Sequence, residues 1–303
     1  MQSAKAGALV DSRQGSASSQ QSSPPPWSSI AAMSGNSSAF TGSIPKDYDA
    51  GLGPIIFAHY AIAMAQHAVS GATSHVLETA CGTGIVTRAL RDALPATTHL
   101  TATDLNGEMM DVARAKVKAG EAVDFQVADG TALPFADASF DTMICQFGMM
   151  FYPDKDRGFR EAYRVLMPGG RYLFSVWDSH GYNPFGKITH GTIASFFSED
   201  PPQFYAVPFS YCDLNQIKEA LLAAGFDSIK ASVLRRLQPV QDFGAFARGA
   251  VFGNPVLHQI TQRGGASPET IRRAVADALR KDLGQEPTAM PLQMILVEAC
   301  KLA

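Results

Sequence analysis

From residue 75 onward, short apolar runs alternate with longer stretches whose apolar residues recur at helical spacing. HVLETA (75–80) begins this alternation, and GIVTRALRDAL (84–94) has the spacing of a helix that buries one face. The pattern predicts five strands and three helices, with strands over residues 75–80, 99–104, 122–129, 140–148 and 171–179 and helices over 84–94, 106–120 and 155–167. Because the strand runs are nearly continuously apolar, they are typical of parallel strands covered on both faces. The predicted fold class is therefore α/β, with a doubly wound, mostly parallel sheet.

The second part of the chain adds two strands and a helical insertion. An irregular, aromatic-rich segment is expected over residues 180–212, and a helix follows it over 213–226. The last two strands are predicted over 227–237 and 290–302, which makes seven in all, with a largely helical insertion over 240–287 between them. The clearest helix of this insertion has Ser267 as its cap, Pro268 in its first turn and Gly284 beyond its end.

Residues 1–44 have a different composition, rich in Ser, Gln, Gly and Pro, with no apolar period. Such a segment buries too little surface to offset the entropy of ordering, so we expect a disordered tail before a domain over residues 45–303. The stretch over 53–69 is apolar but carries His59, Gln66 and His67. It predicts an amphipathic surface helix rather than a membrane span.

Composition excludes some classes of protein. The chain is 46% hydrophobic and 17% charged with a net charge of -3, which argues against binding of nucleic acids. Its four cysteines form no CxxC pair, so neither a metal site nor a disulfide framework is predicted, and a reducing, cytoplasmic location is expected.

Polar residues stand where the predicted strands end. Glu78 precedes a turn with two glycines, Gly82 and Gly84, at the start of a helix. The other strand-end residues are Asp104, Asp129 and Gln146. A single carboxylate at such a place is often only a helix cap. Several on successive strands indicate a ligand site, and an acid about 20 residues beyond a glycine turn is placed to accept from a ribose diol.

The turn lacks the third glycine of the dinucleotide fingerprint, since Thr87 stands there. Glu78 before the turn would repel a pyrophosphate and attract an ammonium group. A ribose, an adenine and an amino group together describe S-adenosylmethionine (SAM). An NAD(P)-dependent oxidoreductase on the same kind of sheet is the alternative, and a non-catalytic SAM-binding protein is another.

Five motifs stand in the order of a known family. VLETACGTG, TATDLNGEMMDVAR, VADGTALPFADASFD, ICQFGMMFYPD and LMPGGRYLFSVWD resemble motifs one to five of the class I SAM-dependent methyltransferases of the methyltransferase-11 type. The chain is similar to their ubiquinone/menaquinone methyltransferase branch. The resemblance implies a Rossmann-like methyltransferase with SAM as its cofactor. One departure is Ala80, where the family pattern has its first glycine.

The resemblance also implies a set of cofactor-binding residues: Tyr48, Glu78, Gly82, Gly84, Asp104, Leu105, Met109, Asp129, Gly130 and Gln146. Glu78 and the glycine backbone would hold the methionine part, Asp104 the ribose hydroxyls, and Asp129 the adenine amino group. Leu105 and Met109 would flank the adenine, although ordinary packing also explains both. Tyr48 would cover the cofactor, or alternatively pack the first helix on the sheet.

The methyl acceptor is expected to contact the segment after the fifth strand. Its aromatic residues are Phe185, Phe196, Phe197, Phe204, Tyr205 and Phe209. They predict an apolar pocket for a small, partly hydrophobic molecule, with plain core packing as the alternative. Candidate bases in the same region are His180, Tyr182, His190 and Tyr211. Since orientation alone can drive methyl transfer, no catalytic residue is assigned. The oligomeric state is not predicted.

Overall fold

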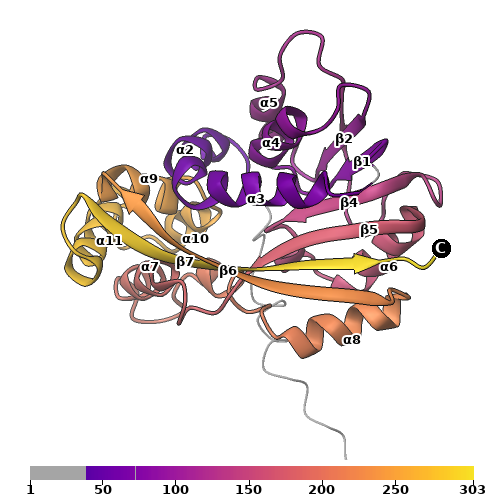
Figure 1. The fold of residues 1–303 in the computed structure, drawn as a ribbon. Coiled ribbons are helices and arrows are strands. Elements are labelled where there is room, and N and C mark those ends of the chain that lie inside the picture. Colours follow the sequence, from indigo (N-terminus) through magenta and orange to yellow (C-terminus); the bar gives the residue numbers. More distant parts are fainter. Residues whose placement is uncertain (1–38, 72) are drawn as a thin grey trace, which may run out of the picture.

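The computed structural model describes residues 39–71 and 73–303, which build one seven-stranded sheet (Figure 1). The strands are β1 (His75–Glu78), β2 (His99–Asp104), β3 (Val123–Val127), β4 (Phe140–Gln146), β5 (Leu166–Trp177), β6 (Ser228–Val240) and β7 (Thr288–Cys300). Their order in the sheet is β3-β2-β1-β4-β5-β7-β6. The first five strands run parallel, and β7 runs antiparallel to both β5 and β6. The predicted fold class is confirmed.

Strand order reverses at β1, because the chain goes from β1 outward to β2 and β3 and then returns to β4 on the other side. In sheets of this kind, ligands bind outside the carboxyl ends of the strands at this reversal. Those ends are Glu78, Asp104 and Gln146 for the three central strands.

Helices cover both faces of the sheet. The elements that pack on it are α2 (Ile44–Gly51), the π-helical turn η1 (Gly53–Phe57), α3 (Ala58–Ala68), α4 (Ile85–Ala93), α5 (Gly107–Arg114), the 3-10 turn η2 (Met149–Phe151), α6 (Lys155–Val165) and α8 (Leu214–Ala224). Helix α3 packs beside α4 above the sheet in Figure 1, and α6 packs beside α8 below it. Helix α5 ends six residues earlier than predicted, because the chain turns at Ala115 and stays irregular up to β3.

Further helices gather at one end of the long β6–β7 ribbon, on the left of Figure 1. They are α7 (Pro184–Ala194), the 3-10 turn η3 (Phe204–Ala206), α9 (Phe243–Phe252), α10 (Val256–Arg263) and α11 (Pro268–Leu283). The helical character of the insertion and the helix after Ser267 agree with the sequence pattern.

The prediction of an irregular segment over 180–212 was wrong for residues 184–194, where α7 forms. Pro184 in the first turn pre-sets the backbone for this helix. The fully buried Asn183 anchors the turn before the helix, because its side chain exchanges hydrogen bonds of 2.9 Å with the backbone of Gln293 in β7. Because the partner of Asn183 lies 110 positions away, the sequence around Asn183 carries no local pattern that would predict this contact.

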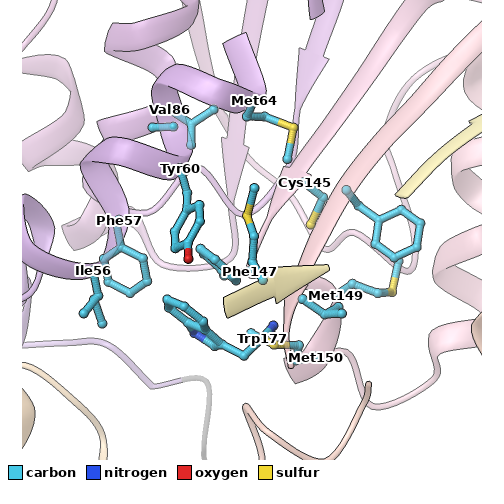
Figure 2. Packing of buried hydrophobic residues seen from close by; sticks show 14 of the residues in the cluster. Ile56, Phe57, Tyr60, Met64, Val86, Cys145, Phe147, Met149, Met150 and Trp177 are labelled. Carbon is cyan, nitrogen blue, oxygen red and sulfur yellow. Dashed lines mark hydrogen bonds between the residues drawn. The ribbon is translucent and has the colours of Figure 1, made fainter. Parts of the chain in front are cut away.

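Part of the hydrophobic core lies between α3 and the sheet. Figure 2 shows Tyr60 and Met64 of α3 pointing toward Phe147 and Cys145 at the end of β4. The helix is amphipathic as predicted, since Tyr60 and Met64 are buried while His59 and Gln66 are exposed. Within the described ranges, 39–71 and 73–303, none of the helices combines the length and the apolar character needed to span a bilayer.

Most of the predicted tail, residues 1–38, lies outside the described residues. The last part of it is described: helix α2 begins at Ile44, which is fully buried, and Phe40 packs against the core. The N–H of Phe40 donates to Asn106 Oδ1 at 3.3 Å, and the N–H of Gly42 donates to Glu108 Oε2 at 2.5 Å. This segment is therefore tied to the start of α5.

Helices α2 and α9 approach each other through a pair of glycines. A Cβ at Gly51 would lie 2.6 Å from the Gly249 Cα, which is backbone and cannot rotate away. We expect Gly51→Ala to lower the free energy of unfolding by about 1–3 kcal/mol, measured by denaturant unfolding. Gly191→Ala is the matched control, because Gly191 lies in α7 with open space around it. Equal stability of the two variants would contradict the close approach.

Candidate active site

A cleft of about 940 Å³, part of it open to solvent, lies at the carboxyl ends of β1, β2 and β4. The predicted cofactor residues in its wall are Tyr48, Gly82, Asp104, Leu105, Met109, Asp129, Gly130 and Gln146. Glu78 and Gly84 are the two predicted residues that do not line it. The structure thus brings eight of ten together, from segments spread over about 100 positions.

The glycine turn after β1 has a left-handed backbone at three positions. The φ angles of Ala80, Gly82 and Gly84 are 53°, 55° and 76°. The two glycines serve different purposes. Gly82 faces the cleft, and a Cβ there would make only ordinary contact with Met109. A Cβ at Gly84 would lie 2.6 Å from the Ala113 Cβ, so Gly84 allows the start of α4 to approach α5.

Asp104 connects the glycine turn to the end of β2. One carboxylate oxygen accepts from the Gly82 N–H and the other from the Asn106 N–H, each at 2.8 Å. Only 7% of Asp104 is exposed, and this burial raises its pKa although the backbone hydrogen bonds act in the opposite direction. Oδ1 also accepts from the side-chain amide of Asn106 at 3.3 Å, whereas Oδ2, which accepts from the Gly82 N–H, keeps a lone-pair direction free. The group is therefore placed to accept from a hydroxyl of a ligand in the cleft.

Glu78 lies beneath the turn rather than in the cleft. It is 1% exposed, and its Oε2 accepts from the Thr87 hydroxyl at 2.6 Å. Burial raises the pKa of Glu78 to about 8, against the lowering effect of the Thr87 hydrogen bond, and the nearby Asp104 charge raises it further. Of the three carboxylates expected to share one hollow, Asp104 and Asp129 line it and Glu78 does not.

Asp129 and Gly130 form the wall of the cleft after β3. Asp129 Oδ1 accepts from the N–H and the hydroxyl of Thr131, both at 2.8 Å, which holds the loop in a tight turn. A Cβ at Gly130 would lie 1.9 Å from the Tyr152 hydroxyl, so only glycine leaves room for this ring.

Gln146 presents an unsatisfied polar atom to the cleft. Its Oε1 is buried, and no described residue donates to it. A buried oxygen without a partner is costly, so its place in the cleft wall fits a ligand that carries a donor. Above the cleft, Tyr48 stacks on Phe57 with the ring centroids 5.1 Å apart. Tyr48 therefore lines the cleft and also packs α2 against η1.

A second cavity of about 480 Å³, part of it open to solvent, adjoins the cleft, and its walls are mostly aromatic. Its lining includes Leu52, Ile56, Phe57, Met150, Trp177, Phe185, Phe204, Tyr205, Pro208, Phe209 and Asn254. It shares Phe40, Tyr48, Phe147 and Phe151 with the cleft. Figure 2 shows Phe57, Phe147 and Trp177 grouped at this boundary, and the rings of Phe147 and Trp177 stack at 4.1 Å.

Four of the six predicted pocket aromatics line this cavity, while Phe196 and Phe197 pack on the core beside it. None of the four candidate bases, His180, Tyr182, His190 and Tyr211, lines either cavity. His180 Nε2 lies 3.2 Å from the Tyr205 carbonyl oxygen and its ring packs on Phe209.

The sequence pattern did not point to several lining residues. Phe40 is the only aromatic residue between the Ser-rich stretch and the first helix, which is a weak signal for a contact. Phe147 has a positive φ of 53°, which is unusual for a bulky residue and cannot be read from the sequence. Phe57 and Trp177 are ordinary members of apolar runs.

The sheet order, the glycine turn and the cleft at the strand ends define the class I SAM-dependent methyltransferase fold. Residues 76–170 match the family model described as a methyltransferase domain. This part of the chain is therefore a methyltransferase domain, similar to the ubiquinone/menaquinone branch.

One curated relative is the ubiquinone/menaquinone biosynthesis C-methyltransferase UbiE of Geotalea daltonii, 32% identical over 134 residues, which are 43% of this chain and 56% of that protein. The chain spans about half the length of the curated relatives that it matches. The family model and these relatives give no support to the alternative of an NAD(P)-dependent oxidoreductase.

Solved structures share the fold. The YcgJ protein of Bacillus subtilis has a TM-score of 0.54 at 22% identity, covering 81% of this chain and 99% of that one. Phosphoethanolamine N-methyltransferase 2 of Haemonchus contortus, solved with S-adenosyl-L-methionine, has a TM-score of 0.57 at 17% identity. That match covers 88% of this chain and 59% of the other.

Proposed function

We propose that the protein transfers a methyl group from SAM to a small, largely apolar acceptor. The observation that carries the proposal is the pair of adjoining cavities: a polar cleft at the strand ends, and an aromatic cavity that shares four of its residues. This arrangement supports the binding of a nucleoside and an apolar molecule next to each other. Similarity to C-methyltransferases of quinone biosynthesis supports the same reading.

The polar groups in the wall of the cleft fit SAM. Asp104 would accept from a ribose hydroxyl and Asp129 from the adenine amino group, with Leu105 exposed at the rim to cover the base. Gln146 Oε1 would accept from the amino-acid part or from the acceptor. The role of Glu78 would be indirect, because it supports the turn from below.

The residues around the shared wall would act by orientation. When bound, SAM supplies an electrophilic methyl group on a positively charged sulfur. Tyr48, Phe147 and Phe151 lie between the two cavities, so they would fix the approach of the acceptor and exclude water. Holding two reactants in line contributes on the order of 7–11 kcal/mol to a displacement of this kind.

The acceptor class follows from the cavity walls. Aromatic and aliphatic side chains dominate them, and such walls favour a flat, apolar ring over a charged metabolite. We propose a quinone-related molecule, in keeping with the relative named above.

The test is incubation with SAM carrying an isotope-labelled methyl group and a panel of oxidised and reduced quinones. Mass spectrometry is expected to find one labelled methyl group on a ring of this type. Phe204→Ala should lower kcat/KM for that acceptor by about tenfold through lost apolar contact, while the Kd for SAM stays unchanged, because Phe204 lines only the aromatic cavity.

Phe196→Ala is the matched control, since Phe196 lines neither cavity. SAM binding without transfer to any member of the panel would instead favour the non-catalytic alternative.

A further inference from the structure

Asn254 is a buried polar residue in the wall of the aromatic cavity. It lies in the link between α9 and α10 and is 5% exposed. The surrounding lining is largely aromatic and aliphatic. A polar side chain in such a place is costly unless its hydrogen-bonding groups have partners.

The neighbouring polar groups determine the orientation of the Asn254 side-chain amide. Its Nδ2 donates to the carbonyl oxygens of Ala250 at 3.2 Å and Gly249 at 3.4 Å. It also donates at 3.2 Å to the Tyr205 hydroxyl, whose own proton goes to the Ala250 carbonyl at 2.7 Å. Turning the amide over would place its oxygen against two carbonyl oxygens. Asn254 Oδ1 therefore points away from them, and no donor among the described residues reaches it.

The other polar groups of the cavity wall do not offer an equivalent acceptor. The Tyr205 hydroxyl is engaged with backbone, and the Trp177 indole has only a donor. Tyr48 lines the cleft as well, where its burial and the charges of Asp104 and Asp49 raise its pKa. Its hydroxyl thus belongs to the cofactor side.

We propose that Asn254 Oδ1 accepts a hydrogen bond from a hydroxyl or N–H group of the methyl acceptor and selects acceptors that carry one. This inference rests on the proposed function, because it assigns the aromatic cavity to the acceptor. An acceptor that offers only an ether or carbonyl at this position leaves Oδ1 without a donor. Sites built to bind a donor reject analogues that lack it for this reason.

A purely structural role explains Asn254 less well. Without its side chain, the Gly249 carbonyl still accepts from the Gly253 N–H at 2.9 Å, and the Ala250 carbonyl still accepts from Tyr205. Its removal therefore leaves neither carbonyl without a partner. The helical insertion contributes this residue, so the part of the chain outside the matched methyltransferase domain would decide which acceptor binds.

The experiment measures the binding of two probes, 4-butylphenol and 4-butylanisole, to the full chain saturated with S-adenosylhomocysteine, by calorimetry. The two probes differ at one position: the phenol carries a hydroxyl group that can donate a hydrogen bond, and in the anisole a methyl group replaces the hydroxyl proton. In Asn254→Leu, which keeps the branched shape of the side chain and removes the oxygen, the ratio of phenol to ether affinity is expected to fall about fivefold relative to the wild type. Phe196→Ala is the control and should keep the wild-type ratio, because Phe196 lines neither cavity.

An unchanged ratio in Asn254→Leu would overturn the proposal, as would failure of both probes to bind the wild-type protein. Asn254→Ala is the second variant if the leucine does not fit, and the same fall in the ratio is expected. The measurement needs no methyl transfer. A phenol preference that depends on Asn254, together with no transfer to any acceptor, would remove the proposed function and keep this assignment.

Discussion

Asp104→Ala is expected to weaken SAM binding by about tenfold to a hundredfold, because hydrogen bonds to a charged group contribute about 1.5–3 kcal/mol. The carboxylate holds the glycine turn through the Gly82 N–H and keeps a lone pair for a ligand. Removing it thus takes away a ligand contact and loosens the backbone around the cofactor. Calorimetric titration with SAM measures the effect.

The variant should also unfold at a lower temperature than the wild type. In the alanine protein the N–H groups of Gly82 and Asn106 lose their acceptor at a largely buried position. Sequence reasoning alone, which assigned only a ribose contact to Asp104, predicts an intact fold, and the structure adds this second effect. Asp124→Ala is the control, since it removes one exposed carboxylate from the neighbouring strand. Equal SAM affinity in the two variants would remove Asp104 from the site.

Glu78→Gln is expected to make the protein more stable at alkaline pH. The pKa of Glu78 is raised by burial from 4.5 to about 8, so between these values the folded protein holds a proton that the unfolded chain releases. The unfolding free energy of the wild type therefore falls as pH rises through this window, by up to about 1.4 kcal/mol per pH unit. Below pH 4.5 the stabilising contribution of protonated Glu78 is fully present, and above pH 8 it is lost.

Glutamine stays neutral at every pH, and its amide oxygen can still accept from the Thr87 hydroxyl. Denaturant unfolding at pH 5, 7 and 9 should show a shallower decline for Glu78→Gln than for the wild type. If the unfolding free energies of the two proteins changed with pH in parallel, ionisation of Glu78 would not destabilise the folded protein. The same variant tests the role expected from the sequence: a strong loss of SAM affinity would restore Glu78 as the partner of the amino group.

The part of the site nearest to the sheet could be predicted because it depends on local patterns. Asp104 ends a strand that neighbours the strand before Gly82, and parallel neighbours end at one edge of a sheet. Asp129 and Gln146 follow the same rule, and both line the cleft. The rule fails to predict the position of Glu78. Side chains of successive strand residues point to opposite faces of the sheet, and the sequence pattern does not say which of them faces the cleft.

The acceptor side could be predicted only in outline. An aromatic pocket was expected from residues 185–209, and four of six aromatic residues line it. The remaining wall includes Phe40, Phe57, Trp177 and Asn254, which lie in four separate segments. No short-range pattern relates these segments, because their meeting depends on the packing of α2 against α9 through Gly51 and Gly249.

By itself the sequence determined the seven strands, their parallel core and the polar edge proposed to bind the cofactor, since alternation of apolar runs and turn residues is a local property of the chain. Only the tertiary structure decided that Glu78 lies under the turn, that Gly84 serves helix packing, and that Asn254 faces an aromatic cavity. These features depend on which surfaces meet across long stretches of chain, and burial, rather than residue type, determines what each side chain does there.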